Sequence, residues 1–373
     1  MFHNINDSDL LYHLPASSME SATNPSELYY DSYYDESNAT VDYALHEMPC
    51  LKEEVRTFNK SFLPAFYSIA FLIGLPGNSL VIAIYAYIKK LKTRTDVYIM
   101  HLAIADLLLL FTLPFWATNA VHGWVFGNPL CKITTAIYTM TFSVSMQFLA
   151  WISVDRYNAI VKSPSQQRTT KLCSKICFFV WMAGTFLCLP DLIFNQVKEF
   201  HGKIACVSTF PESLSKIIKV TIEVGEMALC FVLPFFIMLT CYSAVARALF
   251  KSPSVKKTQP LKVLAAVVSV FIVTQLPYNV IKLWRAIDII YPLITNCKAS
   301  KAMDVAFEVT NSIALFHSCL NPLLYFFMGA SLKMHMVKLA KRYGYWRRQQ
   351  NIPPEEIPMD YEESAEQTSS LII

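Results

Sequence analysis

A run of tyrosines and carboxylates near the N-terminus is the first group of side chains that could carry chemistry. Within residues 29–36, four tyrosines lie among acidic residues: Tyr29, Tyr30, Tyr33 and Tyr34. Tyrosines beside carboxylates are targets for sulfation in a secretory compartment, and Tyr33 and Tyr34 suit it best. Because residues 1–60 contain 11 acidic and three basic residues, this segment would attract a basic partner and speed its encounter. A solvated tail without a partner would have the same composition.

Two Asn-x-Ser/Thr triplets, at Asn6 and Asn38, lie in the same segment. They are acceptors for N-glycosylation if the segment is extracellular, although such triplets also occur by chance. A third triplet, at Asn59, is expected to lie too close to the membrane for modification.

The cysteines predict disulfides rather than a metal site. None of the ten forms a C-x-x-C pair, which argues against a zinc array. Four lie on the side that the charge pattern below places outside, where conditions are oxidising. Four cysteines permit three connectivities. We predict Cys131–Cys206, between the start of the third apolar run and the loop before the fifth, and Cys50–Cys297, which precede the first and seventh runs.

Asp106 lies deep in the second apolar run. An ionisable side chain within a membrane is expensive and is therefore a functional candidate by default. The alternative is a polar network that only holds helices together.

These groups must be positioned by membrane-spanning helices. Of the 373 residues, 54% are hydrophobic and 16% are charged, and the apolar runs reach the length of about 20 residues that crosses a bilayer. A soluble all-helical protein would not carry such long uncharged runs. We predict an all-α membrane protein, a seven-transmembrane helix bundle with the spans 61–88, 97–121, 131–161, 173–194, 216–249, 262–290 and 302–328.

Basic residues fix the orientation. They gather without acidic residues in 89–94, 156–175, 247–262 and 333–348, which predicts that these stretches face the cytoplasm and that the N-terminus is outside. No apolar signal peptide is visible in the first 49 residues, so the first span is expected to act as an uncleaved anchor.

This topology divides the chain into four parts: an extracellular acidic tail (1–60), the bundle (61–328), an amphipathic helix 8 on the inner leaflet (329–345) and a cytoplasmic tail (346–373). The basic residues are explained by topology and anionic lipid, so we expect no nucleic acid partner.

The order of motifs along the chain resembles that of the rhodopsin-like receptors. They are Gly77-Asn78, Leu102-Ala103 with Asp106, Asp155-Arg156-Tyr157, Pro234 with Tyr242, Pro277, and Asn321-Pro322-Leu323-Leu324-Tyr325. Within that class the chain resembles the chemokine receptors. The similar segments are residues 112–116 (TLPFW), residues 124–127 (WVFG), the second cysteine pair and His317-Ser318-Cys319. Residues 92–124 and 270–291 look most like the atypical, scavenging members.

The resemblance implies roles for two groups of buried polar residues. Asp106 and Ser145, with Asn78 and Asn321, would surround a sodium ion and water; no other cofactor or metal is expected. A second group would line an outer cavity that takes the ligand's basic groups: Trp116, Tyr138, Glu226, Tyr278, Glu308 and Asn311. Tyr138 and Tyr278 could instead be ordinary interhelical packing. Asn311 stands where the family commonly has glutamate, and Glu308, one turn earlier, could supply the charge.

At the inner face, the resemblance makes Arg156 beside Asp155 the inactive-state lock and the G-protein contact. Asn158 and Lys162 depart from the usual continuation, and Gln275 replaces the aromatic that precedes Pro277. The residues assigned to transduction are Asp155, Arg156, Tyr157, Tyr242, Gln275, Pro277, Asn321, Pro322 and Tyr325. Ser364, Thr368, Ser369 and Ser370 lie beside carboxylates, a pattern that arrestin could read once phosphorylated.

The predicted function is capture of basic chemokines at the plasma membrane, with arrestin-linked internalisation, recycling through early endosomes and weak or no signalling through heterotrimeric G proteins. A conventional signalling chemokine receptor is the alternative, supported by the intact Asp155-Arg156-Tyr157. A transporter or channel is disfavoured because no internal repeat is visible. An enzyme is least expected because no catalytic motif appears.

Overall fold

The computed structural model describes residues 50–89, 91, 93–161, 170–200, 203–251 and 258–328. Several predicted features lie outside these ranges and stay predictions: sulfation of Tyr29, Tyr30, Tyr33 and Tyr34, glycosylation of Asn6 and Asn38, helix 8 at 329–345, and phosphorylation of Ser364, Thr368, Ser369 and Ser370.

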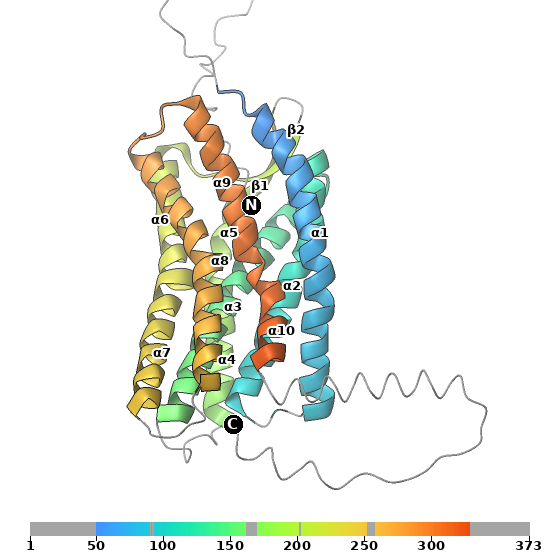
Figure 1. Cartoon of the computed structure of the whole chain (residues 1–373). Coiled ribbons are helices and arrows are strands. Elements are labelled where there is room, and N and C mark those ends of the chain that lie inside the picture. Colours follow the sequence, from blue (N-terminus) through green and yellow to red (C-terminus); the bar gives the residue numbers. More distant parts are fainter. Residues whose placement is uncertain are drawn as a thin grey trace, which may run out of the picture.

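The described helices form seven spans that run up and down through one bundle (Figure 1), which confirms the predicted fold class. Five spans are α1 (Glu53–Ala83, continued by a π-helical turn at Ile84–Lys89), α2 (Arg94–His122), α3 (Gly127–Val161), α4 (Thr170–Leu187, followed by the short α5, Leu189–Phe194) and α8 (Thr258–Ile290). The fifth span joins α6 (Ser215–Met227) to α7 (Leu233–Lys251) through a π-helical turn at Ala228–Val232. The seventh joins α9 (Cys297–Leu315) to α10 (His317–Met328).

The outer surface of the bundle suits lipid. Among the described residues, five segments are long and apolar enough to cross a membrane: Glu53–Ala86, Arg94–His122, Gly127–Val161, Leu172–Phe194 and Glu212–Phe250. Large apolar side chains point outward from them, including Leu72 and Phe186, each 71% exposed. A soluble protein rarely exposes so much contiguous apolar surface, so the soluble all-helical alternative does not fit.

Several prolines lie within the spans. Pro114, Pro277 and Pro322 lie inside α2, α8 and α10, where a membrane bundle can tolerate the lost hydrogen bond. Pro190 lies at the start of α5, and Pro234 is the second residue of α7. Pro190 therefore takes a position that needs no backbone N–H donor, whereas Pro234 lies within the fifth span, directly after the π-helical turn that continues α6 into α7.

A two-stranded hairpin on the outer side was not anticipated. The antiparallel strands β1 (Asn195–Phe200) and β2 (Lys203–Ser208) pair Val197 with Cys206. The sequence prediction relied on apolar runs of membrane length, and strands this short produce no such run. The disulfide Cys131–Cys206, with a Cα–Cα distance of 5.6 Å, ties β2 to the start of α3, so the hairpin covers the outer end of the bundle.

Gly123 fixes the loop that meets this hairpin. Its φ of +79° is a left-handed conformation that favours glycine, and a Cβ there would lie 2.7 Å from the Ile204 carbonyl oxygen. The next residue, Trp124, donates its backbone N–H to the same oxygen at 2.8 Å. The loop after α2 is thereby held against β2.

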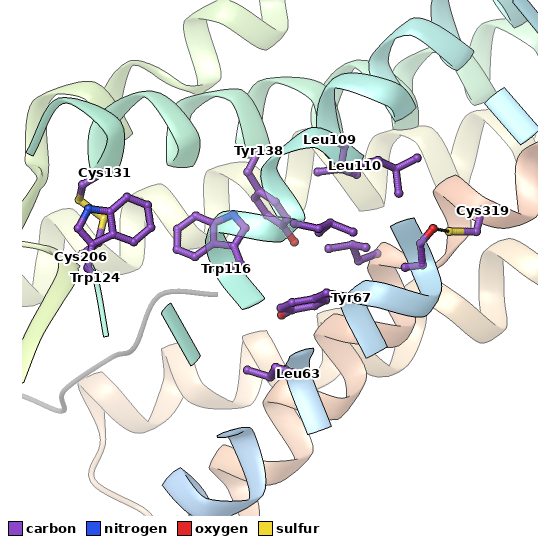
Figure 2. Close-up of a cluster of buried hydrophobic side chains, with 13 residues drawn as sticks. Leu63, Tyr67, Leu109, Leu110, Trp116, Trp124, Cys131, Tyr138, Cys206 and Cys319 are labelled. Atoms are coloured by element: carbon purple, nitrogen blue, oxygen red, sulfur yellow. Dashed lines mark hydrogen bonds between the residues drawn. A yellow bond between two sulfur atoms is a disulfide. The ribbon is translucent and has the colours of Figure 1, made fainter. Parts of the chain in front are cut away.

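The main apolar core lies beneath this cover. Figure 2 shows Trp124 and Trp116 following the disulfide, with Tyr67 and Tyr138 further into the bundle. The two indole rings lie 5.5 Å apart, and the Trp124 Nε1 donates to the Gly127 carbonyl at 2.8 Å. This packing connects α1, α2 and α3 and forms a rigid support for an outer cavity.

Candidate functional site

A cavity of about 110 Å³ opens between α3, α6, α8 and the hairpin. Tyr138, Glu226 and Tyr278 all line it, so three residues assigned to the outer cavity lie together. Since a water occupies about 30 Å³, the space suits several waters or the end of an extended chain.

The charges of this cavity differ from the purely anionic set that was expected. Its charged lining is balanced between acidic and basic residues: Asp191, Glu223, Glu226, Lys219, Lys282 and Arg285. The Lys282 ammonium lies 2.8 Å from the Glu226 carboxylate, and their side chains are 12% and 24% exposed. Glu226 is therefore neutralised by a residue that the sequence analysis missed. Helical spacing could have placed Lys282 in the cavity, because it lies four residues after Tyr278 and so on the same face of the helix.

Trp116, Glu308 and Asn311 do not line this cavity but lie buried in the bundle. Asn311 is joined to the cavity wall because the Tyr138 hydroxyl donates to its Oδ1 at 3.2 Å. Glu308 Oε2, Asn311 Nδ2 and Trp116 Nε1 make no hydrogen bond to any residue the structure describes. These three groups therefore keep polar capacity inside the bundle, and Glu308 is the buried carboxyl that was expected to compensate for Asn311.

The outer rim is tied together at the first and seventh spans. The predicted disulfide Cys50–Cys297 is formed, with a Cα–Cα distance of 5.5 Å. Next to it, Lys52 Nζ lies 2.8 Å from Asp304 Oδ2, and Lys301 Nζ lies 3.3 Å from Glu54 Oε2. The segment from Cys50 to Glu54 is thus fixed against α9, at the outer end of the bundle where the cavity opens.

A polar network crosses the middle of the bundle. Asp106 is fully buried; it accepts a hydrogen bond from Ser145 Oγ at 2.9 Å and another from Asn321 Nδ2 at 2.8 Å. Asn78 does not bond to Asp106; it donates to the carbonyls of Gly74 and Ser318. Asp106, Ser145 and Asn321 are therefore brought together, whereas Asn78 links α1 to α10.

Gln275 links α8 to the junction of α9 and α10. Its Nε2 donates to the Ala314 carbonyl at 2.9 Å and lies 3.4 Å from His317 Nδ1. Gln275 is 1% exposed, so the residue that replaces the expected aromatic is a buried hydrogen-bonding group, two residues before Pro277.

At the inner end, the expected pairing of Asp155 with Arg156 is not formed among the described residues. Asp155 instead accepts a hydrogen bond from the Thr95 hydroxyl, and the Arg156 side chain is exposed. Ser153 Oγ donates to the Tyr242 hydroxyl at 2.7 Å, which connects α3 to α7. Tyr157 follows Arg156 in α3. The backbone of Pro322 and Tyr325 lies in α10, and the side chain of Tyr325 lies outside the part of the chain that the structure describes.

Seven spans, a disulfide from the third span to the outer hairpin, and an outer cavity above a buried aspartate define a class of membrane receptor. In agreement, a family model described as 7 transmembrane receptor (rhodopsin family) matches residues 77–325. The chain is therefore a receptor of the plasma membrane with several spans, and not an enzyme.

Comparison with individual proteins narrows the class. The chain is 57% identical to atypical chemokine receptor 4 of Bos taurus over 92% of this chain and 97% of that protein. Identity to the Homo sapiens receptor of the same name is also 57%, over 92% and 97%. C-C chemokine receptor type 9 of Homo sapiens is 38% identical, over 84% of this chain and 87% of the relative. The chain belongs to the chemokine receptor family, and it is more similar to these atypical receptors than to the type 9 receptor.

Proposed function

We propose that this receptor captures basic chemokines of the C-C class at the cell surface and carries them inward with weak or no activation of heterotrimeric G proteins. The observation that carries the proposal is the 57% identity to receptors named atypical over nearly the whole chain. The outer cavity supports ligand capture, because it combines aromatic walls with convergent charged groups. Its size favours the extended end of a ligand over a folded domain.

The inner end of α3 supports the atypical assignment. The residues that follow Asp155-Arg156-Tyr157 depart from the signalling pattern at Asn158 and Lys162. A second candidate, a conventional G-protein-signalling receptor for chemotaxis, is favoured by the intact Asp155-Arg156-Tyr157 with Arg156 exposed.

Uptake and signalling measured in the same cells distinguish the two. Cells expressing the full chain would receive a panel of fluorescent C-C chemokines beside a G-protein activation sensor. We expect uptake of some members without sensor response. Robust calcium release that pertussis toxin blocks would favour the conventional receptor instead.

Further partners follow from the same proposal. Phosphorylation at Ser364, Thr368, Ser369 and Ser370 would add charge for arrestin to bind, followed by recycling through early endosomes. Residues 329–345 would lie on anionic lipid of the inner leaflet. Truncation after residue 345 should slow uptake while leaving chemokine binding at the surface unchanged; unchanged uptake would exclude the tail as the arrestin site.

A sodium ion beside Asp106 and Ser145 is also proposed. The support is a buried carboxylate with a hydroxyl 2.9 Å away, a combination of oxygen atoms that suits a small cation.

A further inference from the structure

Arg285 is a partly buried cation on the cavity wall, and its guanidinium makes no hydrogen bond to the residues that the structure describes. It lines the outer cavity from α8, and its side chain is 15% exposed. Its guanidinium lies 4.3 Å from the centre of the Phe307 ring, which holds it in place by a cation–π contact. Among the described residues it has one ionic partner, Asp304, at 3.7 Å, which is beyond ordinary hydrogen-bond distance.

Asp304 divides its two oxygens between Lys52 and Arg285, and only the contact with Lys52 has hydrogen-bond distance. The Lys52 ammonium lies 2.8 Å from the other oxygen of the same carboxylate. Asp304 is therefore committed to the outer rim, beside the Cys50–Cys297 disulfide. Arg285 keeps a planar fork of N–H donors, the geometry that binds a carboxylate through two parallel hydrogen bonds.

Lys282 adds a second cation at the same place. It lies three residues before Arg285 and therefore on the same face of α8, and it lines the same cavity. Its ammonium donates to Glu226 at 2.8 Å, which uses one of its three donors. An incoming anion could take the other two, or displace Glu226 and leave that carboxylate for a cation of the ligand.

We propose that Arg285 and Lys282 form a subsite for a carboxylate on the ligand segment that enters the cavity. The inference rests on the proposed function, and the carboxylate belongs to an Asp or Glu side chain ahead of the first cysteine of the captured chemokine. A single negative charge suits the site better than a phosphate, because Asp191, Glu223 and Glu226 line the same cavity. The cavity thus selects an N-terminal segment that carries both an ammonium and an acidic side chain.

The test is a double-mutant cycle on the full chain in cells, with an N-terminal epitope tag to report the amount at the surface. The probe is the chemokine of the uptake panel that the wild type binds best. In its matched variant, which is called the amidated chemokine below, every Asp and Glu ahead of the first cysteine is changed to Asn or Gln. Both are titrated against the wild type, Arg285→Gln and the control Lys298→Gln, which removes one exposed positive charge from the start of α9.

We expect the amidated chemokine to bind the wild type and Lys298→Gln about 10- to 100-fold more weakly than the native chemokine, as expected for a lost charge-assisted pair. On Arg285→Gln the two chemokines should bind alike, within about twofold. Should Arg285→Gln fail to reach the surface, Arg285→Lys serves instead; it keeps the charge but loses the fork, so the difference between the two chemokines should shrink to several-fold.

Three results would overturn the subsite. First, the amidated chemokine could bind more weakly than the native one by the same factor on the wild type and on the Arg285 variants. Second, the two chemokines could bind equally well to every form of the receptor. Third, the best-bound chemokine could lack an acidic residue ahead of its first cysteine. A wild type that binds no chemokine of the panel would refute the proposed function itself. Binding without coupling to Arg285 would refute this inference alone.

Discussion

The Lys282 ammonium of α8 lies 2.8 Å from the Glu226 carboxylate of α6, and this pair joins the fifth and sixth spans across the outer cavity. Both side chains are mostly buried, so each charge depends on the other for its compensation. The pair is therefore both a structural clasp and part of the surface that a ligand meets.

Breaking this pair from one side should destabilise the receptor. Glu226→Gln leaves the Lys282 charge without its carboxylate, at a cost of about 1–3 kcal/mol given that the pair is partly solvated. We expect a lower thermal midpoint of the detergent-solubilised protein. The double variant Glu226→Gln/Lys282→Gln should recover most of the loss, because no charge is left unpaired; additive losses in the double variant would show that the two residues act independently.

The two disulfides should differ in what their loss does. Cys131–Cys206 anchors the hairpin over the core, so Cys131→Ser should sharply reduce delivery to the cell surface; losing a native disulfide typically costs about 2–5 kcal/mol. Cys50–Cys297 closes the rim between spans that the bilayer already holds, so Cys50→Ser/Cys297→Ser should reach the surface and bind chemokine more weakly. Flow cytometry with an epitope tag measures delivery, and Cys241→Ser, at a free cysteine, is the control. Equal delivery of both disulfide variants would contradict this division.

Gly123 offers a test of the hairpin's attachment. Gly123→Ala places a Cβ 2.7 Å from the Ile204 carbonyl at a φ of +79°, so we expect a loss of about 1–3 kcal/mol and a lower thermal midpoint. The control is Gly225→Ala in α6, where a Cβ would meet no atom within 4 Å and helix propensity favours alanine. Equal midpoints for the two variants would mean that β2 does not hold this loop.

The spans could be predicted because each one corresponds to a continuous apolar stretch of the sequence. A membrane-length apolar run needs no knowledge of its neighbours. The disulfides followed from the order of the cysteines relative to those runs. The hairpin at 195–208 was missed because six-residue strands with mixed polarity carry no comparable signal.

The cavity could be predicted only in part, because pairing across it depends on how each helix is rotated. Glu226 lies just before the π-helical turn at Ala228–Val232, and such a turn inserts a residue and shifts the faces on either side of it. Lys282 follows Pro277, which perturbs the geometry of α8. The sequence therefore placed Tyr138 and Tyr278 correctly and Trp116 wrongly. It did not indicate that Lys282 neutralises Glu226 or that Arg285 lies on the same wall.

Asp106 provides the most direct test of the proposed sodium ion. Its carboxylate accepts from Ser145 at 2.9 Å and from Asn321 at 2.8 Å, which leaves lone pairs for an ion on the side of the Ser145 hydroxyl. If sodium binds only the folded receptor, its thermal midpoint should rise with NaCl and not with choline chloride of equal ionic strength. Asp106→Asn removes the charge that attracts the ion, so its midpoint should be the same in the two salts. Ser145→Ala keeps the carboxylate and should show a reduced sodium effect. A sodium response that survives Asp106→Asn would place the ion elsewhere, and a wild type that does not distinguish the two salts would leave Asp106 as a purely structural hydrogen-bond acceptor between α2, α3 and α10.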